Sequence, residues 1–203
     1  NIKHAINALD GEHKLQQAKE NANLLINSLN DLNAPQRDAI NRLVNEAQTR
    51  EKVAEQLQSA QALNDAMKHL RNSIQNQSSV RQESKYINAS DAKKEQYNHA
   101  VREVENIINE QHPTLDKEII KQLTDGVNQA NNDLNGVELL DADKQNAHQS
   151  IPTLMHLNQA KQNALNEKIN NAVTRTEVAA IIGQAKLLDH AMENLEESIK
   201  DKE

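Results

Sequence analysis

The amino-acid sequence predicts an all-α fold of tandem three-helix bundles, joined by long shared helices into an elongated rod. Three observations support this prediction: the composition, an internal repeat and the spacing of apolar residues. The 203-residue chain has no Cys, Trp or Phe, two Tyr, four Gly, three Pro and 36% hydrophobic residues. Strands favour aromatic and β-branched residues and need frequent turn residues, so strands are not expected. The modest hydrophobic share suits slim bundles in which each helix buries a narrow stripe.

The internal repeat has a period of 125 residues. A shift of this length, without a gap, aligns residues 5–74 with residues 130–199, and 27 of the 70 aligned pairs are identical. For example, ALNDAMKHLRNSI (62–74) aligns with LLDHAMENLEESI (187–199). A period of this length is too long for one solenoid unit, and it indicates an array of small domains. Weaker similarities within the period indicate two three-helix units of roughly 60 residues each.

Apolar residues recur at steps of three and four in both copies, as in the helices of bundles. This regular spacing disfavours the alternative that the chain is disordered. We expect the stripe to form the structural core, and its main members are Val53, Leu57, Leu63, Met67 and Leu70, with Val178, Ile182, Leu188, Met192 and Leu195. The charged positions between them differ in sign between the copies, which is typical of a solvated face.

The first two helix boundaries follow from cap and breaker residues. In NDLNAPQ, Pro35 fits a first helical turn, with Asn33 or Ala34 as the N-cap. In EAQTRE, Thr49 fits the N-cap of the next helix, because its hydroxyl can accept a free amide N–H. Each of these two segments is therefore expected to end one helix and begin another.

The later boundaries follow the same rules. In KYINASDAKK (85–94), Ser90 or Asn88 is the expected N-cap. NEQHPTLDKE (109–118) forms the next break, around its proline. In the second copy, Thr174 has Glu177 three residues later, a spacing that predicts a capping box.

Between these breaks the helical pattern is expected to run without interruption over residues 51–84 and 115–151. At 1.5 Å per residue, each such helix would be roughly 50 Å long. One small bundle does not cover that length, so each long helix is expected to end one bundle and begin the next. Gly126 and Gly136 are candidates for a bend in the second run. Pro152, which is absent from the first copy, predicts an earlier helix end there.

Charge and composition exclude several classes of partner. The net charge is −7 and no cluster of Lys and Arg is present, which disfavours nucleic acid. No apolar run approaches the roughly 20 residues that a membrane span needs, and no membrane contact is expected within this segment. The chain begins within helical sequence and shows no signal peptide, so we expect it to be a fragment.

The sequence also resembles a known family. YINASDAKKEQYNHAVREVENIINEQHPTLDKEIIKQLTDGVNQANNDLNG (86–136) resembles the FIVAR modules of Gram-positive surface proteins. LNDLNAPQRDAINRLVNEAQT and ALNDAMKHL resemble the GA-like module that alternates with FIVAR in giant staphylococcal matrix-binding proteins. The resemblance implies four parts: the end of a preceding FIVAR-like module (1–11), a GA-like three-helix bundle (12–78), a FIVAR three-helix bundle (79–136) and a second GA-like bundle (137–203).

No catalytic, cofactor-binding or metal-binding residue is predicted, no cofactor is expected, and the ligand-binding residues are unknown. No two of the eight histidines are four residues apart, and no HExxH motif is present. His13, His69, His148 and His190 align with other residues in the other copy. We expect solvated histidines on helix surfaces. Tyr97 and Tyr86 are expected to fill the end of a bundle, and an exposed, ligand-binding Tyr86 is the alternative.

The resemblance implies a non-enzymatic segment at the bacterial cell surface, extracellular and associated with the cell wall. It would act as a monomeric spacer and adhesive scaffold that binds host matrix protein such as fibronectin, or cell-wall components. A specific albumin- or immunoglobulin-binding module is the alternative. Related GA modules bind albumin through their middle helix, but here Arg42 and Leu43 align with Glu167 and Lys168. A binding surface shared by both copies is therefore not expected. A spectrin-like rod is disfavoured because Trp is absent.

Overall fold

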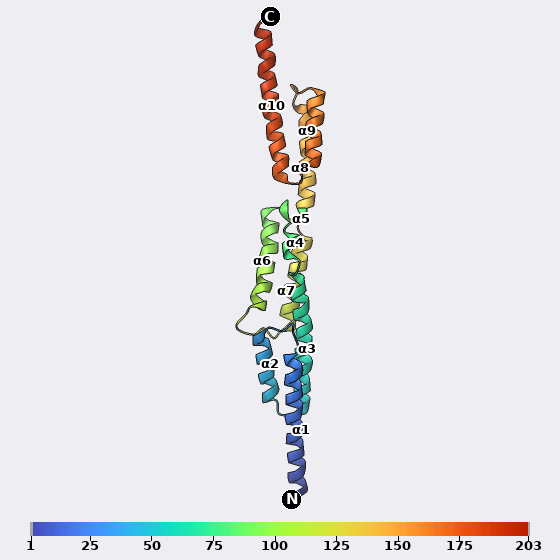
Figure 1. Ribbon diagram of the computed structural model, residues 1–203, viewed down its shortest axis with the longest axis vertical. Helices are drawn as coiled ribbons and strands as arrows, with labels where there is room; N and C mark the ends of the chain where they lie inside the picture. The colour runs from blue at the N-terminus through green and yellow to red at the C-terminus, as the bar shows by residue number, and fades with distance from the viewer. Residues whose placement is uncertain (1, 203) are drawn as a thin grey trace. The chain divides into compact units, whose positions relative to one another are not determined.

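The computed structural model describes residues 2–202, so Asn1 and Glu203, the outermost residues of the expected modules, lie outside the described residues. All regular elements within that range are helical, as predicted (Figure 1). They are α1 (Ile2–Asn27), α2 (Ala34–Glu46), α3 (Arg50–Ser73), α4 (Gln77–Val80), α5 (Ser84–Ile87), α6 (Asp91–Ile108), α7 (Lys117–Asn132), α8 (Gly136–Ser150), the 3-10 helix η1 (Ile151–Thr153), α9 (Gln159–Asn171) and α10 (Arg175–Lys202).

The chain forms two compact units. The first comprises the chain up to residue 77 together with residues 96–132, and the second comprises residues 78–95 together with the chain from residue 133 onward. Each unit therefore combines segments that are far apart in the sequence.

In the first unit, α1, α2 and α3 pack on one another as a three-helix bundle, and α3 also packs against α7. The helix α3 is thus shared between two packing arrangements, as the sequence predicted. The buried apolar residues of this unit lie on all five of its helices and in the α1–α2 turn; they are Ala22, Ile26, Leu32, Ile40, Val44, Val53, Ala60, Leu63, Met67, Leu70, Tyr97, Val101, Val104, Ile120, Val127 and Ala130.

In the second unit, α8, η1, α9 and α10 enclose one core, and α5 packs against α8. The core residues are Leu140, Ala147, Ile151, Leu157, Leu165, Ile169, Ala172, Val178 and Ala185, with Leu154, Ile181, Ile182 and Met192 packed against them. Among the described residues, no helix is both long enough and apolar enough to cross a membrane.

The predicted caps are largely confirmed. Asn33 is the N-cap of α2, its side chain accepts the Gln36 N–H at 2.9 Å, and the Gln36 side chain accepts the Asn33 N–H in return. Thr49 accepts the Lys52 N–H at 3.1 Å. Ser90, the first of the two candidates for the third break, accepts the Lys93 N–H. Pro152 lies in η1, and α8 ends at Ser150, as the early break predicted.

The capping box predicted at Thr174 is only half present. The Thr174 hydroxyl accepts the Glu177 N–H at 3.1 Å, as expected. The Glu177 carboxylate, however, accepts the N–H of Val173, one residue before the cap. The carboxylate still satisfies a free amide near the positive end of α10, so the stabilising effect is similar.

The two uninterrupted runs predicted for 51–84 and 115–151 are wrong. The first ends at Ser73, within a stretch rich in Ser, Asn and Gln; the short Ser and Asn side chains compete with the helix for backbone hydrogen bonds. The second is interrupted between Asn132 and Gly136, where Asp, Asn and Gly are poor helix formers. The helix α7 continues through Gly126, so the break lies beside Gly136.

Candidate functional site

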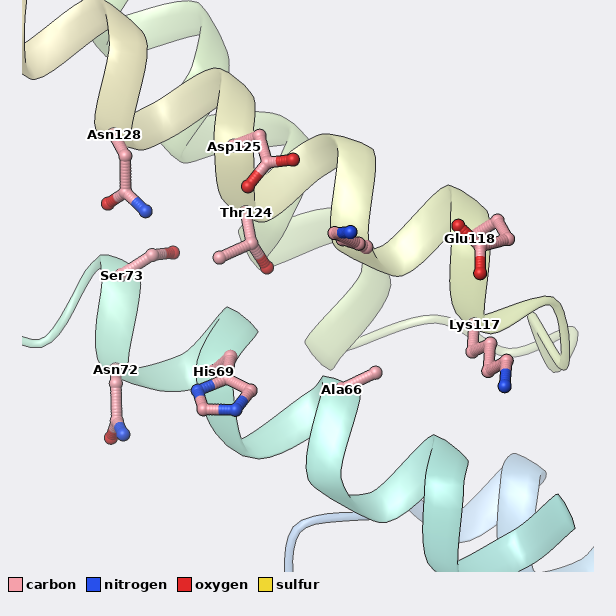
Figure 2. A pocket seen from close by; sticks show the side chains of 10 residues that line it. Ala66, His69, Asn72, Ser73, Lys117, Glu118, Thr124, Asp125 and Asn128 are labelled. Atoms are coloured by element: carbon pink, nitrogen blue, oxygen red, sulfur yellow. The ribbon is translucent and has the colours of Figure 1, made fainter.

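A well-formed concavity of the first unit is a groove between α3 and α7, with a volume of about 600 Å³ (Figure 2). Figure 2 shows Ser73 and Asn128 at one end, and Ala66 and Glu118 towards the other, so the two helices run in the same direction. The residues that line the groove are Ala66, His69, Asn72, Ser73, Lys117, Glu118, Lys121, Thr124, Asp125 and Asn128.

The helical period explains why polar side chains line this groove. Met67 and Leu70 of α3, and Ile120 and Val127 of α7, are buried where the two helices pack. The residues beside each buried position face the outer edge of the seam, because neighbouring side chains on a helix point about 100° apart. The groove is therefore the solvated margin of an apolar contact.

The groove carries charges of both signs. Lys117 and Lys121 bring two ammonium groups, and Glu118 and Asp125 bring two carboxylates. An arrangement of this kind suits a polar ligand with groups of both signs, such as the surface of a protein, rather than a polyanion.

Two hydroxyl groups of the groove donate hydrogen bonds to backbone carbonyl groups of their own helices. Ser73 donates its hydroxyl hydrogen to the Leu70 carbonyl at 2.6 Å, and Thr124 donates to the Ile120 carbonyl at 3.1 Å. Their oxygen atoms remain able to accept a hydrogen bond from a ligand. Over residues 2–202, no group of three or more His, Cys, Asp or Glu side chains is arranged to hold a metal ion.

Sequence reasoning missed this groove, because its two sides lie about 50 residues apart in the chain. One signal was available. Thr124 occupies a position in the apolar stripe of α7 and is buried, with 8% of its surface exposed. A polar residue at a buried position is unusual, and it indicates that the apolar contact between the helices borders a polar surface there.

The predicted structural residues are buried in the first copy and only partly buried in the second. Val53, Leu63, Met67 and Leu70 are buried, and Leu57 is half-buried. In the second copy, Val178 is buried, and Ile182 and Met192 are half-buried against the core.

Two stripe residues of the second copy are wrongly assigned to the core. Leu188 and Leu195 of α10 are exposed, at 37% and 53%. In the first copy, α7 packs against the aligned helix α3. Within the described chain, α8 and α9 pack against α10, and the last described residue, Lys202, ends the helix. The aligned stripe thus has a different exposure in each copy.

The histidines make contacts within and between helices. His148 Nδ1 and Nε2 each lie 2.7 Å from an amide oxygen, those of Asn166 and Asn170. His156 lies in the α8–α9 connection, 3.0 Å from the Glu196 carboxylate. The hydrogen bond to Glu196 raises the pKa of His156, desolvation opposes this shift, and the charges of Asp189, Glu196 and Glu193 add to it.

The two tyrosines differ in burial. Tyr97 of α6 is fully buried in the core of the first unit. Tyr86 of α5 is half-buried, and the Lys94 ammonium lies 5.7 Å from the centre of its ring. The expectation that both tyrosines fill the end of a bundle is therefore met by Tyr97, and only in part by Tyr86.

The middle helices of the two copies differ in sequence but share a contact. Arg37 of α2 donates to the Leu32 carbonyl at 3.0 Å, and the aligned Gln162 of α9 donates to the Leu157 carbonyl at 3.0 Å. The two side chains therefore have the same structural role. The positions that differ on the outer face are Arg42 and Leu43 of α2, and Leu43 is exposed.

These features define a class of protein: tandem helical bundles with an internal repeat, in which adjacent modules share helices. Two family models match the chain. The GA module matches residues 12–66 and 137–191, and the FIVAR domain matches residues 66–135. The chain therefore belongs to the family of GA-module proteins, and it carries a FIVAR domain between its two GA modules.

Two curated relatives are proteins of Staphylococcus aureus. "Extracellular matrix-binding protein ebh" of strain MW2 is 46% identical over 200 residues, which is 98% of this chain and 2% of the relative. "Extracellular matrix-binding protein EbhA" of strain Mu3 is 44% identical over 98% of this chain and 3% of the relative. The chain thus spans only a small part of these relatives.

Solved structures agree with the fold. The crystal structure of an EbhA domain (756–1003) from Staphylococcus aureus has a TM-score of 0.83 and 28% identity, and the match covers 89% of this chain and 74% of that one. A structure described for Embp-mediated Staphylococcus epidermidis adherence to fibronectin has a TM-score of 0.59 and 35% identity, over 61% of this chain and 98% of that one.

Proposed function

We propose that this chain is a repeat segment of a giant bacterial surface protein, where it serves as a spacer and an adhesive scaffold for extracellular matrix. The observation that carries the proposal is the similarity to matrix-binding relatives over 98% of the chain. We further propose fibronectin as the matrix ligand, because the Embp structure is described for adherence to fibronectin. On this proposal the segment is extracellular, associated with the cell wall, and non-enzymatic.

We place the contact with fibronectin at the α3–α7 groove. It is a well-formed concavity of the first unit, and its charges of both signs suit a protein surface. An open groove lined by polar side chains supports weak binding by one copy. Many copies on one chain would raise the overall strength through effective concentration, without any new contact.

The module boundaries are part of the same proposal. Residues 1–11 would end a preceding FIVAR-like module, residues 12–78 and 137–203 would be GA-like bundles, and residues 79–136 would form the FIVAR bundle. Supporting this division, the GA module matches twice with the FIVAR domain between, in the same order.

The proposal is tested by binding of the 203-residue chain to immobilised fibronectin in biolayer interferometry. The charge-reversed groove variant Lys121→Glu is expected to lower binding at least threefold. Lys186→Glu on α10 makes the same change in charge at an exposed position outside the groove, and it is expected to bind like the unaltered chain.

Two results would contradict the proposal. Equal loss in both variants would mean that net charge, rather than the groove, controls binding. Tight one-to-one binding to serum albumin or immunoglobulin in the same assay, without binding to fibronectin, would favour the specific binding module instead. The GA modules make that comparison necessary.

A further inference from the structure

The sequence contains one Asn–Gly pair, Asn135–Gly136, at the start of α8. In an unfolded chain such a pair is chemically unstable. The backbone nitrogen of the glycine attacks the side-chain carbon Cγ of the asparagine and closes a five-membered succinimide ring. The amide hydrogen of the glycine leaves with the side-chain amino group as ammonia. Glycine hinders this attack least, because it has no side chain and adopts the widest range of backbone conformations.

Water then opens the succinimide ring in one of two places. Cleavage of the bond from the glycine nitrogen to Cγ gives aspartate. Cleavage of the bond from the same nitrogen to the backbone carbonyl carbon gives isoaspartate, in which the main chain runs through Cβ and Cγ. Either product has gained one water and lost one ammonia relative to asparagine, so water is the only other reactant.

The folded chain holds the two reacting atoms of this pair apart. Ring closure needs the Gly136 nitrogen on the same side of the Asn135 Cα–C bond as Cβ. At the Asn135 ψ of 18°, the Gly136 nitrogen is instead almost eclipsed with the backbone nitrogen of Asn135 and turned away from Cβ. Rotation of ψ would also break a hydrogen bond in the first turn of α8, in which the Asn135 carbonyl accepts the Leu139 N–H at 3.0 Å.

The glycine is held in this position by a turn of the backbone. A Cβ atom added at Gly136 would lie 2.6 Å from the Lys85 carbonyl oxygen and 2.8 Å from the Ala89 nitrogen, and it would overlap the Ser84 carbonyl oxygen. These are backbone atoms, which do not move aside as a flexible side chain would. No glycine has a positive φ among the described residues, so Gly136 is required here for space rather than for conformation.

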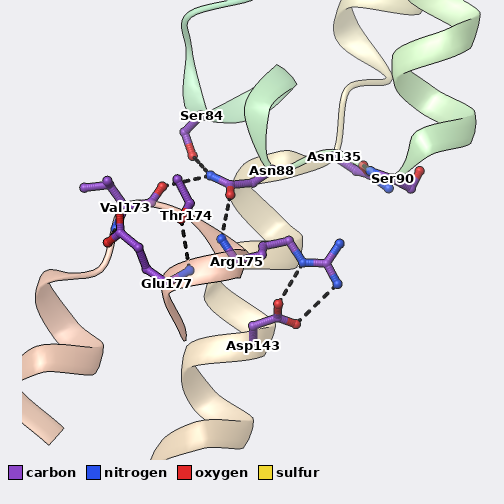
Figure 3. Close-up of polar contacts among 9 residues, drawn as sticks. All are labelled: Ser84, Asn88, Ser90, Asn135, Asp143, Val173, Thr174, Arg175 and Glu177. Carbon is purple, nitrogen blue, oxygen red and sulfur yellow. Dashed lines mark hydrogen bonds and ion pairs between the residues drawn. The ribbon is translucent and has the colours of Figure 1, made fainter. Parts of the chain in front are cut away.

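The turn that packs on Gly136 is itself anchored by a buried asparagine (Figure 3). Asn88 is 2% exposed; its amide donates to the Val173 carbonyl at 3.0 Å, and its oxygen accepts the Arg175 N–H at 2.8 Å. These hydrogen bonds join residues 84–90 to the beginning of α10. The turn is therefore a fixed surface against which α8 begins.

The Asn135 side chain is bound to the same turn. Its oxygen accepts the Ser90 N–H at 3.0 Å, which fixes the position of the neighbouring carbon Cγ. Residues 84–90 thus hold both reacting atoms: Cγ through Ser90, and the nitrogen through the packing on Gly136. Reaction at this pair therefore requires the turn and the start of α8 to separate.

The two products differ in how well they fit this place. Aspartate keeps an oxygen acceptor for the Ser90 N–H and brings a negative charge to the positive end of α8. Isoaspartate adds one atom to the main chain between Leu134, which is 5% exposed, and the tightly packed Gly136. The longer main chain has to displace one of these two residues.

We propose that Asn135–Gly136 is a deamidation site controlled by the fold. The site is closed while the turn of residues 84–90 is packed on Gly136, and it reacts when the second unit opens. The isoaspartate product then prevents the turn from packing again, so a molecule that has been open is covalently marked. The inference does not depend on the ligand, and loss of fibronectin binding would leave it intact.

The first test compares the rate of modification in the folded and the unfolded 203-residue chain. The chain is incubated at neutral pH with and without guanidinium chloride. Mass spectrometry with electron-transfer fragmentation then measures aspartate and isoaspartate at residue 135. The folded chain is expected to react at least about tenfold more slowly, because the reaction requires a rarely populated open state. Equal rates in the two conditions would overturn the proposal.

A variant of the turn tests which contact closes the site. Asn88→Ala removes the anchoring hydrogen bonds and is expected to raise the rate at Asn135 several-fold without denaturant. Asn171→Ala, at an exposed position of α9, is the matched control and is expected to react like the unaltered chain. Circular dichroism establishes that both variants remain helical. Equal rates in two helical variants would show that the turn does not control the reaction.

The two products provide a test that does not depend on the Asn88 variant. Expression of Asn135→Asp supplies the aspartate form, and the isoaspartate form is purified from chain aged in denaturant and then refolded. The two molecules have the same composition and differ only in the course of the main chain at residue 135. The aspartate form is expected to unfold at nearly the same guanidinium concentration as the unaltered chain, and the isoaspartate form at a clearly lower one. Equal midpoints for both forms would contradict the proposal.

Discussion

At the scale of single residues, some side-chain contacts occur at the same aligned positions in both copies, although much of the surrounding sequence differs. Lys19 donates to the Asn45 carbonyl at 2.7 Å, and the aligned Lys144 donates to the Asn170 carbonyl at 3.0 Å. These side chains join the first and second helices of each GA-like bundle. A contact found at the same place in both copies indicates a structural role for residues that lie on a solvated face.

One contact is kept although both partners change. In the first copy, the Arg71 guanidinium donates to the Asp31 carbonyl at 2.9 Å. In the second copy, Glu196 takes the place of Arg71 and His156 takes the place of Asp31. The side chains of these two residues interact at 3.0 Å. The contact of the permanently charged Arg71 is therefore replaced in the second copy by a contact whose cation, His156, is charged only when protonated.

This replacement predicts a pH dependence. The hydrogen bond to Glu196 raises the pKa of His156 above 6.5, so protonation is favoured in the folded state. The stabilisation is present in full below the unfolded pKa, and it is lost as the pH rises through the higher folded pKa. His156→Gln is expected to lower the unfolding midpoint at about pH 5 and to have a smaller effect at about pH 8.

The measurement is thermal unfolding followed by circular dichroism at both pH values. His13→Gln on α1 is the control, because His13 is exposed. A destabilisation by His156→Gln that is independent of pH would contradict the ionic role of this pair.

Asn88 allows a second prediction at this scale. Its amide group makes hydrogen bonds to Val173, Arg175 and Ser84 while it is buried. Asn88→Ala leaves buried backbone groups without partners, and it is expected to lower the free energy of unfolding of the second unit by about 1–3 kcal/mol. Urea unfolding measures this change, with the exposed Asn171→Ala as the control. Equal effects of the two substitutions would contradict the anchoring role.

At the scale of elements, the exposure of a helix stripe depends on which helix packs against it. Leu63 and Leu188 are aligned in the repeat. In each copy a buried alanine, Ala60 or Ala185, lies three residues earlier. Leu63 is 2% exposed and Leu188 is 37% exposed. Because α7 packs along α3, we infer that this extra helix causes the difference, and that burial follows the packing partner rather than the local sequence.

This pair of aligned residues provides a matched experiment. Leu63→Ala removes a fully buried side chain and is expected to cost about 2–5 kcal/mol of unfolding free energy. Leu188→Ala removes a partly exposed one and is expected to cost less than about half as much. The midpoints of urea unfolding compare the two variants. A similar loss in both would show that α7 does not account for the burial of Leu63.

At the scale of the whole molecule, the 125-residue repeat predicts tandem modules and an elongated particle. A compact 203-residue protein has a radius of gyration of about 17 Å. Small-angle X-ray scattering of the 203-residue chain is expected to give a clearly larger value. A radius of gyration near the compact value would contradict the predicted rod.

Much of the fold could be predicted because the relevant signals are short in range. The caps at Asn33 and Thr49 and the break at Pro152 depend on side chains that contact the backbone within three or four residues. The alternatives at the third break could not be separated in this way. Asn88 is as good a cap as Ser90 by composition, but it is used instead to anchor residues that lie 85 and 87 positions later.

The candidate site could be predicted less well, for the same reason. His69 and Asp125 lie on helices that are separate in the sequence, and only the packing of α3 on α7 places them along one groove. Their residue types carry no motif. Thr124 is a polar residue among the buried positions of α7, and its residue type alone does not indicate which helix faces it.

The sequence by itself determined the helical class, the repeat and the packing stripe, because these depend on composition and on spacings of a few residues. The tertiary structure decided where the long helices end, which copy of the stripe is buried, and why Gly136 has no side chain. Each of these depends on atoms brought together from distant parts of the chain. Gly11 and Gly136 have the same place in the repeat, and only the turn at residues 84–90 makes one of them obligatory.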